Sequence, residues 1–305
     1  MKKLSLILIL IFAVQISALA QCDVQEYITR ELEKAKVEDY EGVIEELNKA
    51  LEIDPINEIL YFQRGFLKLC NKKYQEAILD FSKVLTNDSL SAYVYCCTGL
   101  AKIMLNDFKG ARQYFSKAIK TDPKFFDAYN LRGLMKQQLY DKKGALEDYN
   151  KAIQLKPDYA EVYNNRGNVK LDLRDTLGAI LDYNKAIIFD SENATAYRNL
   201  GLVYELLNNY DEAIFNYNTS IEIDIDYSDA YNGRGYLKFK FKNFWGAIGD
   251  YDKAIELNPK FGLAYYNRAL ANKEIGRLNE ACSDFQKSQE LGYEWGEWAI
   301  EKYCK

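Results

Sequence analysis

The sequence predicts an all-α protein, a right-handed α-solenoid of helical hairpins that repeat every 34 residues and end in a capping helix. Two observations support this prediction. Residue types recur at a spacing of 34 over most of the chain, and each repeat carries two apolar stripes with helical spacing. A fixed period of this kind is typical of solenoids, in which neighbouring repeats bury a continuous core.

The first twenty residues have the three parts of an export signal. Lys2 and Lys3 precede an apolar run over residues 4–14, in which only Ser5 is polar, and an Ala-Leu-Ala cleavage motif follows at 18–20. The apolar run is shorter than a membrane-spanning helix requires. We therefore expect residues 1–20 to be a cleaved signal peptide, and the protein to be periplasmic, associated with the outer membrane or secreted.

Cys22 stands two residues beyond the expected cleavage site and raises the alternative of a lipid anchor. Lipoprotein signals usually have a small residue directly before the modified cysteine, whereas this chain has Gln21 there. Simple export is therefore favoured, and a membrane is expected as a partner only if Cys22 is lipidated.

Three residue types mark the period of 34 residues. The tyrosines are Tyr27, Tyr61, Tyr95, Tyr129, Tyr163, Tyr197, Tyr231 and Tyr265. The glycines are Gly65, Gly99, Gly133, Gly167, Gly201 and Gly235, and the alanines are Ala77, Ala111, Ala145, Ala179, Ala213, Ala247 and Ala281. The four prolines, Pro55, Pro123, Pro157 and Pro259, are also separated by multiples of 34.

The unit at 160–193 illustrates how each repeat forms a helical hairpin. Its first segment, 160–174, has Tyr163, Gly167 and Leu171 on one helical face, and its second, 176–188, has Ala179, Tyr183 and Ala186. The small residues allow two antiparallel helices to approach closely, and the aromatic rings fill the space on either side. A proline or serine shortly after the second segment ends it.

This pattern of aromatic, Gly-x-x-x, Ala-x-x-x-aromatic-x-x-Ala and proline resembles the tetratricopeptide repeat, over residues 24–292. The resemblance implies one degenerate unit at 24–57, with Glu31 and Val43 at the small positions, and seven regular units. The regular units are 58–91, 92–125, 126–159, 160–193, 194–227, 228–261 and 262–292. Residues 294–305 are expected to form a helix that caps the open apolar face of the last unit.

Five units combine an arginine in the first segment with an aspartate in the second. The pairs are Arg64 with Asp80, Arg132 with Asp148, Arg166 with Asp182, Arg234 with Asp250 and Arg268 with Asp284. The two regular units that lack the arginine, with Thr98 and Leu200 there, also lack the aspartate. We therefore predict an ion pair between the two helices of each unit rather than catalytic groups.

The cysteines beyond the signal region suggest one possible disulfide and no metal or redox site. Cys282 and Cys304 lie at a similar height when counted outward from the turn at 291–292, so either a disulfide clamps the cap or both thiols are free. Cys70, Cys96 and Cys97 match neither a redox motif nor a zinc ribbon, and they are interpreted as small apolar residues.

In the family that the chain resembles, the first helices line a concave groove that holds partner segments. The corresponding apolar positions here are Ile59, Phe62, Phe66, Leu69, Tyr93, Leu100, Ile103 and Met104. The polar ones are Asn130, Asn164, Asn165, Asn168, Arg198, Asn199, Asn232 and Asn267. These two sets are the candidate partner-binding residues.

Each set leaves an alternative open. The asparagines suit hydrogen bonding to a partner's main chain, or they are simply soluble residues that the groove tolerates. The apolar set is typical of an interaction surface. It is otherwise covered by the degenerate first unit, through Ile28 and Leu32, or by a second copy of the chain.

Composition and motifs argue against most kinds of catalysis. The chain has no histidine, which removes the Ser-His-Asp systems and all histidine-ligated metal sites, and it has no nucleotide-binding or zinc-protease motif. Its net charge of −5, without a basic stripe, disfavours nucleic acid as a partner. We expect no catalytic residues, cofactor or metal.

The resemblance implies a non-enzymatic scaffold or adaptor of the bacterial cell envelope that binds a peptide or helical segment of a protein partner of unknown identity. A homodimer is an open alternative. Further alternatives are capture of glycans or nutrients, a self-associating structural component and, most remotely, a carboxylate-based hydrolase.

Overall fold

The computed structural model describes residues 40–84 and 89–304, and these residues form sixteen helices and no strand. The expected signal peptide at 1–20, Cys22 and the first helix of the degenerate unit lie outside the described residues. The expectation of an all-α solenoid built from helical hairpins is confirmed. The chain divides after Lys156 into two compact parts, the N-terminal part and the C-terminal part, and each is described by itself.

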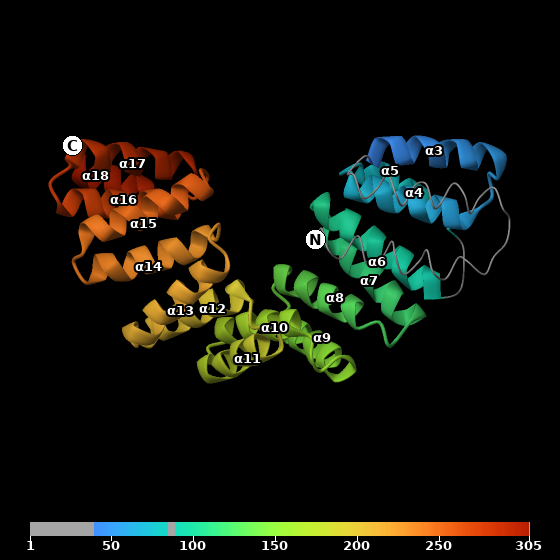
Figure 1. Cartoon of the computed structure of the whole chain (residues 1–305), viewed down its shortest axis with the longest axis horizontal. Coiled ribbons are helices and arrows are strands. Elements are labelled where there is room, and N and C mark those ends of the chain that lie inside the picture. Colours follow the sequence, from blue (N-terminus) through green and yellow to red (C-terminus); the bar gives the residue numbers. More distant parts are fainter. Residues whose placement is uncertain (1–39, 85–88, 305) are drawn as a thin grey trace. The chain divides into compact units, whose positions relative to one another are not determined.

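The described residues of the N-terminal part contain seven helices. They are α3 (Tyr40–Ile53), α4 (Glu58–Cys70), α5 (Tyr74–Phe81), α6 (Ser89–Met104), α7 (Phe108–Thr121), α8 (Phe126–Gln138) and α9 (Lys142–Leu155). From α4 onward they pair into the hairpins α4–α5, α6–α7 and α8–α9; within this part α4–α5 packs on α6–α7, and α6–α7 packs on α8–α9 (Figure 1).

The C-terminal part contains nine helices among its described residues. They are α10 (Ala160–Asp172), α11 (Thr176–Phe189), α12 (Ala194–Leu206), α13 (Tyr210–Ile223), α14 (Ser228–Lys240), α15 (Phe244–Leu257), α16 (Gly262–Glu274), α17 (Leu278–Glu290) and α18 (Gly296–Tyr303). Four hairpins, α10–α11 to α16–α17, are followed by α18, which packs on α17 (Figure 1). The first helices of successive hairpins also contact one another, as in α10–α12 and α12–α14.

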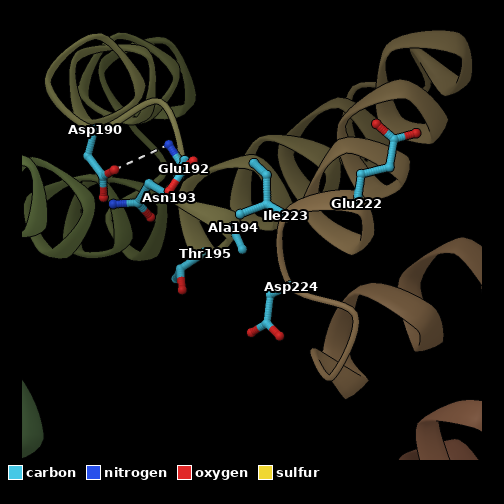
Figure 2. A pocket seen from close by; sticks show the side chains of 8 residues that line it. All are labelled: Asp190, Glu192, Asn193, Ala194, Thr195, Glu222, Ile223 and Asp224. Atoms are coloured by element: carbon cyan, nitrogen blue, oxygen red, sulfur yellow. Dashed lines mark hydrogen bonds between the residues drawn. The ribbon is translucent and has the colours of Figure 1, made fainter. Parts of the chain in front are cut away.

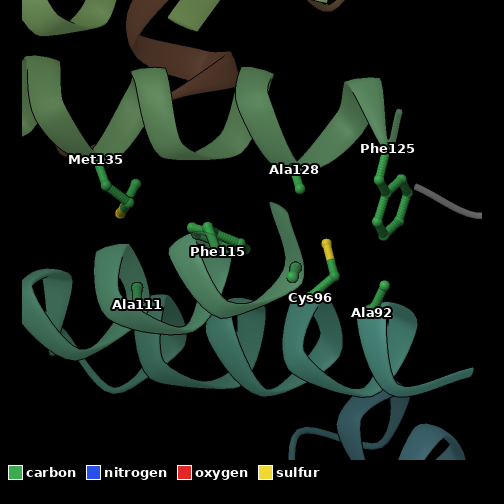
Figure 3. Close-up of a cluster of buried hydrophobic side chains, with 8 residues drawn as sticks. Ala92, Cys96, Ala111, Phe115, Phe125, Ala128 and Met135 are labelled. Carbon is green, nitrogen blue, oxygen red and sulfur yellow. The ribbon is translucent and has the colours of Figure 1, made fainter. Parts of the chain in front are cut away.

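The core of each hairpin forms where a large ring meets a small residue. A Cβ atom added to Gly167 would lie 2.6 Å from the ring of Tyr183, so only glycine allows this approach. The aromatic ring at the same unit position also packs against the next hairpin. Figure 3 shows Phe115 of α7 lying below α8, with Met135 on one side and Cys96 and Phe125 on the other. Phe115 has no exposed surface.

The turn between the two helices of each hairpin has one conformation throughout. A residue with positive φ follows each first helix: Lys72, Asn106, Tyr140, Arg174, Asn208, Lys242 and Gly276. Next comes the N-cap of the second helix, and the side chains of Asp107, Asp141 and Asp175 there accept a hydrogen bond from a glycine N–H three residues on. The turn therefore ends one helix and begins the other within four residues.

The predicted ion pairs are confirmed in all five units, and they are bidentate. In the unit at 160–193, Arg166 Nε donates to Asp182 Oδ2 at 2.8 Å and Nη2 to Oδ1 at 2.6 Å. The aspartate is buried, and Lys170 Nζ lies 2.7 Å from its Oδ2 as a second cation. Lysines at the same position, Lys68, Lys136 and Lys238, contact the aspartates of three other units.

The last helix is covalently attached to the array. Cys282 of α17 and Cys304, which follows α18, form a disulfide with their Cα atoms 5.7 Å apart. Phe285 packs on Tyr303 beside it, with ring centroids separated by 5.9 Å. Cys70, Cys96 and Cys97 carry free thiols, and the last two are buried.

Candidate functional site

Asparagine amides on neighbouring first helices of the C-terminal part bond to one another. Asn199 Nδ2 of α12 donates to Asn164 Oδ1 at 2.9 Å and to Asn168 Oδ1 at 3.1 Å, both on α10. Further along, Asn267 Nδ2 of α16 donates to Asn232 Oδ1 of α14 at 3.0 Å. We call Asn164, Asn165, Asn168, Arg198, Asn199, Asn232 and Asn267 the polar face.

Arg198 of α12 extends this network to α14, the first helix of the next hairpin. Its Nη1 donates to Asn199 Oδ1 at 3.1 Å, and its Nη2 lies 3.3 Å from Asp229 Oδ1 of α14. The amide of Asn199 is therefore bonded on both its oxygen and its nitrogen. Because these contacts run between helices of different units, the polar face also joins each unit to the next.

The members of the polar face differ in accessibility. Asn164 and Asn199 are buried, whereas Asn165, Asn168, Asn232 and Asn267 are half-buried. Asn130, predicted with them, is buried on α8 in the N-terminal part. The half-buried amides are thus the ones within reach of a ligand, and the buried ones hold them in place.

Asn165, Asn199 and Asn267 recur at multiples of 34 residues, and Gly233 interrupts this series for a steric reason. A Cβ atom there would lie 2.5 Å from the ring of Tyr217, which comes from the preceding hairpin. The tip of that tyrosine therefore occupies the place that an asparagine side chain would need.

Tyrosine hydroxyls of the second helices reach the first helices, and sequence reasoning missed them. Tyr183 donates to Asn168 Oδ1 at 2.8 Å, and Tyr217 donates to Glu205 Oε2 at 3.0 Å. In the N-terminal part, Tyr149 donates to Gln137 Oε1 at 3.2 Å. The sequence signal is the choice between tyrosine and phenylalanine at this position of the second helix. The two units with apolar first helices have phenylalanine there, Phe81 and Phe115.

Burial sets the charge state of these groups. It raises the pKa of the Tyr183 and Tyr217 hydroxyls, which therefore stay protonated and act as donors. Burial also raises the pKa of Glu205, against the hydrogen bond from Tyr217 and the charges of Lys240 and Arg198, which lower it. Glu205 is thus a partly desolvated carboxylate beside the polar face.

The predicted apolar residues of the N-terminal part are mostly engaged in packing. Phe62 is buried, with its ring centroid 6.1 Å from that of Phe81, and it is a core residue. Tyr93 packs on Phe125 at 4.7 Å. The half-buried members are Ile59, Phe66, Leu69, Tyr93, Leu100 and Ile103, and only Met104 of this set is exposed.

The cysteines near this apolar set are unreactive in character. Burial raises the pKa of the Cys70 thiol to about 11 and that of Cys97 to about 12. Both therefore remain protonated at neutral pH, and the protonated thiol is a poor nucleophile and metal ligand.

One pocket of about 660 Å³ lies at the α11–α12 connection and the end of α13. Its lining is Asp190, Glu192, Asn193, Ala194, Thr195, Glu222, Ile223 and Asp224, and Figure 2 shows Asp190 accepting a hydrogen bond from the main chain of Glu192. The four carboxylates have no basic residue among them. Over the described ranges, no three cysteine or carboxylate side chains are placed so that they could hold a metal ion together, those of this pocket included. No described helix is both long and apolar enough to cross a membrane.

Comparison with known families bears on the repeats directly. A TPR repeat model matches residues 142–173 and 177–208, and two tetratricopeptide repeat models match 194–227 with 228–261, and 250–283. No curated protein matches the sequence.

Solved structures with the same fold cover most of the chain. A tetratricopeptide repeat protein from Parabacteroides merdae is 18% identical, with a TM-score of 0.58 over 92% of this chain and 98% of its own. The pilF protein of Pseudomonas aeruginosa is 20% identical, with a TM-score of 0.62 over 70% and 98%. The Cut9–Hcn1 hetero-tetramer of the APC/C gives 0.69 at 17% identity, and 87% of this chain spans 53% of that one.

These similarities show the fold and leave the partner open, since identities are low. The repeat models, the hairpins and the solved structures agree on one architecture, that of a scaffold for protein–protein interaction. Residues 142–173 and 177–283 are therefore tetratricopeptide repeats.

Proposed function

We propose that the protein is a non-enzymatic adaptor of the bacterial cell envelope that holds an extended or helical segment of a partner protein against the polar face. The observation that carries this proposal is the hydrogen-bonded series of amides on α10, α12, α14 and α16. Amides that are already oriented lose little entropy when they bind a ligand.

Asn168 is the central residue of the proposed contact. Its Oδ1 accepts hydrogen bonds from Tyr183 and Asn199, which fixes the plane of the amide. Its Nδ2 group donates to no described residue, and the side chain is half-buried rather than covered. Two donors held in this way suit the carbonyl oxygens of a partner main chain, whatever its side chains.

Site-specific photocrosslinking in cells tests the position of the contact. A photoreactive amino acid replaces Asn168 or, as a matched control, Asp211, which is exposed at the start of α13. The proposal expects a discrete protein adduct from position 168 and none from position 211. Equal adducts at both positions, or none at position 168, contradict it.

A substitution then tests the chemistry. Asn168→Asp removes the amide donors, while its carboxylate oxygens still accept from Tyr183 and Asn199, and Asn199 stays bonded to Asn164. We expect the adduct, formed from a probe at Asn165, to fall several-fold while the melting temperature stays within about 2 °C of the wild type. An undiminished adduct excludes an amide contact.

The envelope location depends on residues 1–20. It predicts that the protein recovered from cells begins at Gln21 and fractionates with the envelope. Protein that retains Met1 and stays in the cytosol refutes the location without affecting the binding proposal.

A further inference from the structure

Helix α11 exposes an apolar stripe on the side opposite the core. Leu177 is 75% exposed, Leu181 67% and Ile188 68%. With the exposed Asn184 they stand at i, i+4, i+7 and i+11, a spacing that places all four on one narrow face of a helix. The buried stripe of α11, which includes Ala179 and Tyr183, lies on the other side.

Of the other second helices, α5, α13 and α15 each have one large apolar residue at these four positions (Leu79, Phe215 and Trp245), whereas α11 has three. In α7, α9 and α17 all four residues are polar. They are Lys109, Gln113, Ser116 and Lys120 in α7; Lys143, Glu147, Asn150 and Gln154 in α9; and Asn279, Ser283, Gln286 and Glu290 in α17. The requirements of the hairpin fold therefore do not explain the apolar residues of α11.

The stripe is symmetric about its own centre, which points to a copy of itself as the occupant. Its spacings of four, three and four residues read the same in both directions. Two α11 helices packed antiparallel about a two-fold axis therefore place Leu177 opposite Ile188 of the second copy, and Leu181 opposite Asn184. Such an isologous contact needs no second surface.

Charges at the two ends of α11 favour the same arrangement. Arg174 is exposed just before the helix, between the exposed Asp172 and the N-cap Asp175, which accepts from the Gly178 N–H. Asp190 and Glu192 are exposed just after the helix, with no basic residue beside them (Figure 2 shows the two acids). Antiparallel packing brings the arginine of one copy to the acids of the other and opposes the two helix dipoles. Parallel packing places like charges together.

We propose that α11 is the contact of a two-fold homodimer in which the two α11 helices pack antiparallel. One short helix per copy is a small interface, so the dimer is weak, with a dissociation constant on the order of 10–100 μM. This contact lies on second helices and is independent of partner binding by the polar face.

Sedimentation equilibrium of the protein expressed from its full sequence tests the apolar contact. Leu181→Glu is compared with Leu79→Glu, because Leu79 occupies the same unit position in α5 and is 65% exposed. We expect Leu181→Glu to raise the dissociation constant at least tenfold and Leu79→Glu to leave it unchanged, with circular dichroism showing both folded. A wild type that stays monomeric up to about 500 μM, or equal effects of the two variants, overturns the proposal.

Charge exchange tests the antiparallel orientation. Arg174→Glu and Glu192→Arg should each weaken the dimer several-fold, since each places like charges opposite one another. The double variant should recover the wild-type constant. Single variants that leave dimerisation unchanged, or a double variant that adds the two losses, rule out the antiparallel contact.

Discussion

At the scale of single residues, one hydroxyl group distinguishes units with a tyrosine in the core of the second helix from units with a phenylalanine there. Tyr183 and Tyr217 fill the same space as Phe115, but their hydroxyls reach the first helices and bond to Asn168 and Glu205. The second helix thus supplies polar atoms to the face formed by the first helices. The ring of each tyrosine thus packs in the core, while its hydroxyl donates a hydrogen bond to the candidate site or beside it.

Glu205 should make stability depend on pH in a defined direction. Its folded-state pKa is raised above the ordinary 4.5, so the unfolded state releases this proton at lower pH. The contribution of Glu205 to stability is therefore full below its unfolded pKa and is lost as pH rises through the folded one. Glu205→Gln, which still accepts from Tyr217, should be more stable than the wild type at pH 7.

Urea unfolding at several pH values measures this difference. The advantage of Glu205→Gln should vanish below the ordinary carboxyl pKa of 4.5. An advantage that is constant with pH, or one that grows as pH falls, contradicts the assignment.

Reversing a buried carboxylate should have a far larger effect. Asp182 is 3% exposed and receives two hydrogen bonds from Arg166, so Asp182→Lys places a buried cation against the half-buried Arg166 and Lys170 and removes their shared carboxylate. We expect a loss of about 3–5 kcal/mol in unfolding free energy. The control Asp158→Lys, at an exposed turn, should cost less than about 0.5 kcal/mol. Similar losses for both would show that the ion pair is unimportant.

At the scale of elements, every hairpin uses one turn with a left-handed residue, whatever that residue is. Tyr140 and Arg174 adopt φ of 63° and 67°, and Gly276 adopts 81°. Only glycine takes this conformation without a steric penalty. Six of the seven hairpin turns in the described residues therefore retain strain.

Tyr140→Gly should relieve this strain. Tyr140 is 88% exposed, so its ring contributes little packing, and we expect a gain of about 1 kcal/mol in unfolding free energy. Gly276→Ala should lose a similar amount. Thermal and urea unfolding of the two variants measure both changes, and a destabilised Tyr140→Gly would contradict this account of the turn.

The hairpins and the ion pairs were predictable because they recur. A residue type that returns every 34 positions is distinguished from chance occurrences, and the joint loss of arginine and aspartate in two units identifies the pair from the sequence alone. The lysines beside Asp80, Asp148 and Asp182 were missed, since lysines are common in helices and their presence does not indicate an ion pair.

The burial of the candidate site was less predictable. Whether Asn199 meets Asn164 or water depends on the distance between two neighbouring helices, which the sequence pattern does not encode. For the same reason Phe62 was assigned to a surface, although it packs on Phe81 in the core.

At the scale of the whole molecule, stability is a sum over units and the contacts between neighbours, so the ends matter most. The disulfide between Cys282 and Cys304 fixes α18 over the last hairpin. Ala299 of α18 and Phe285 of α17 are fully buried against each other's helices. The C-terminal end is therefore closed by packing and by a covalent bond.

Removing that bond should loosen one end of the array. Cys304→Ser should reduce stability by about 3 kcal/mol and accelerate amide exchange in α17 and α18, with α10 unaffected. Hydrogen exchange read by mass spectrometry locates the change. A reducing agent should reproduce it in the wild type and add nothing in the variant, and uniform acceleration over all helices would contradict local anchoring.

The ion pairs of the units have a consequence for how the gene can change length. Each buried aspartate is neutralised by cations of its own 34-residue unit, as Asp182 is by Arg166 and Lys170. Unequal recombination that removes or duplicates a whole unit therefore never strands a charge inside the protein. Copy number is free to vary by whole units, whereas a frame of any other length breaks the pairing of arginine with aspartate.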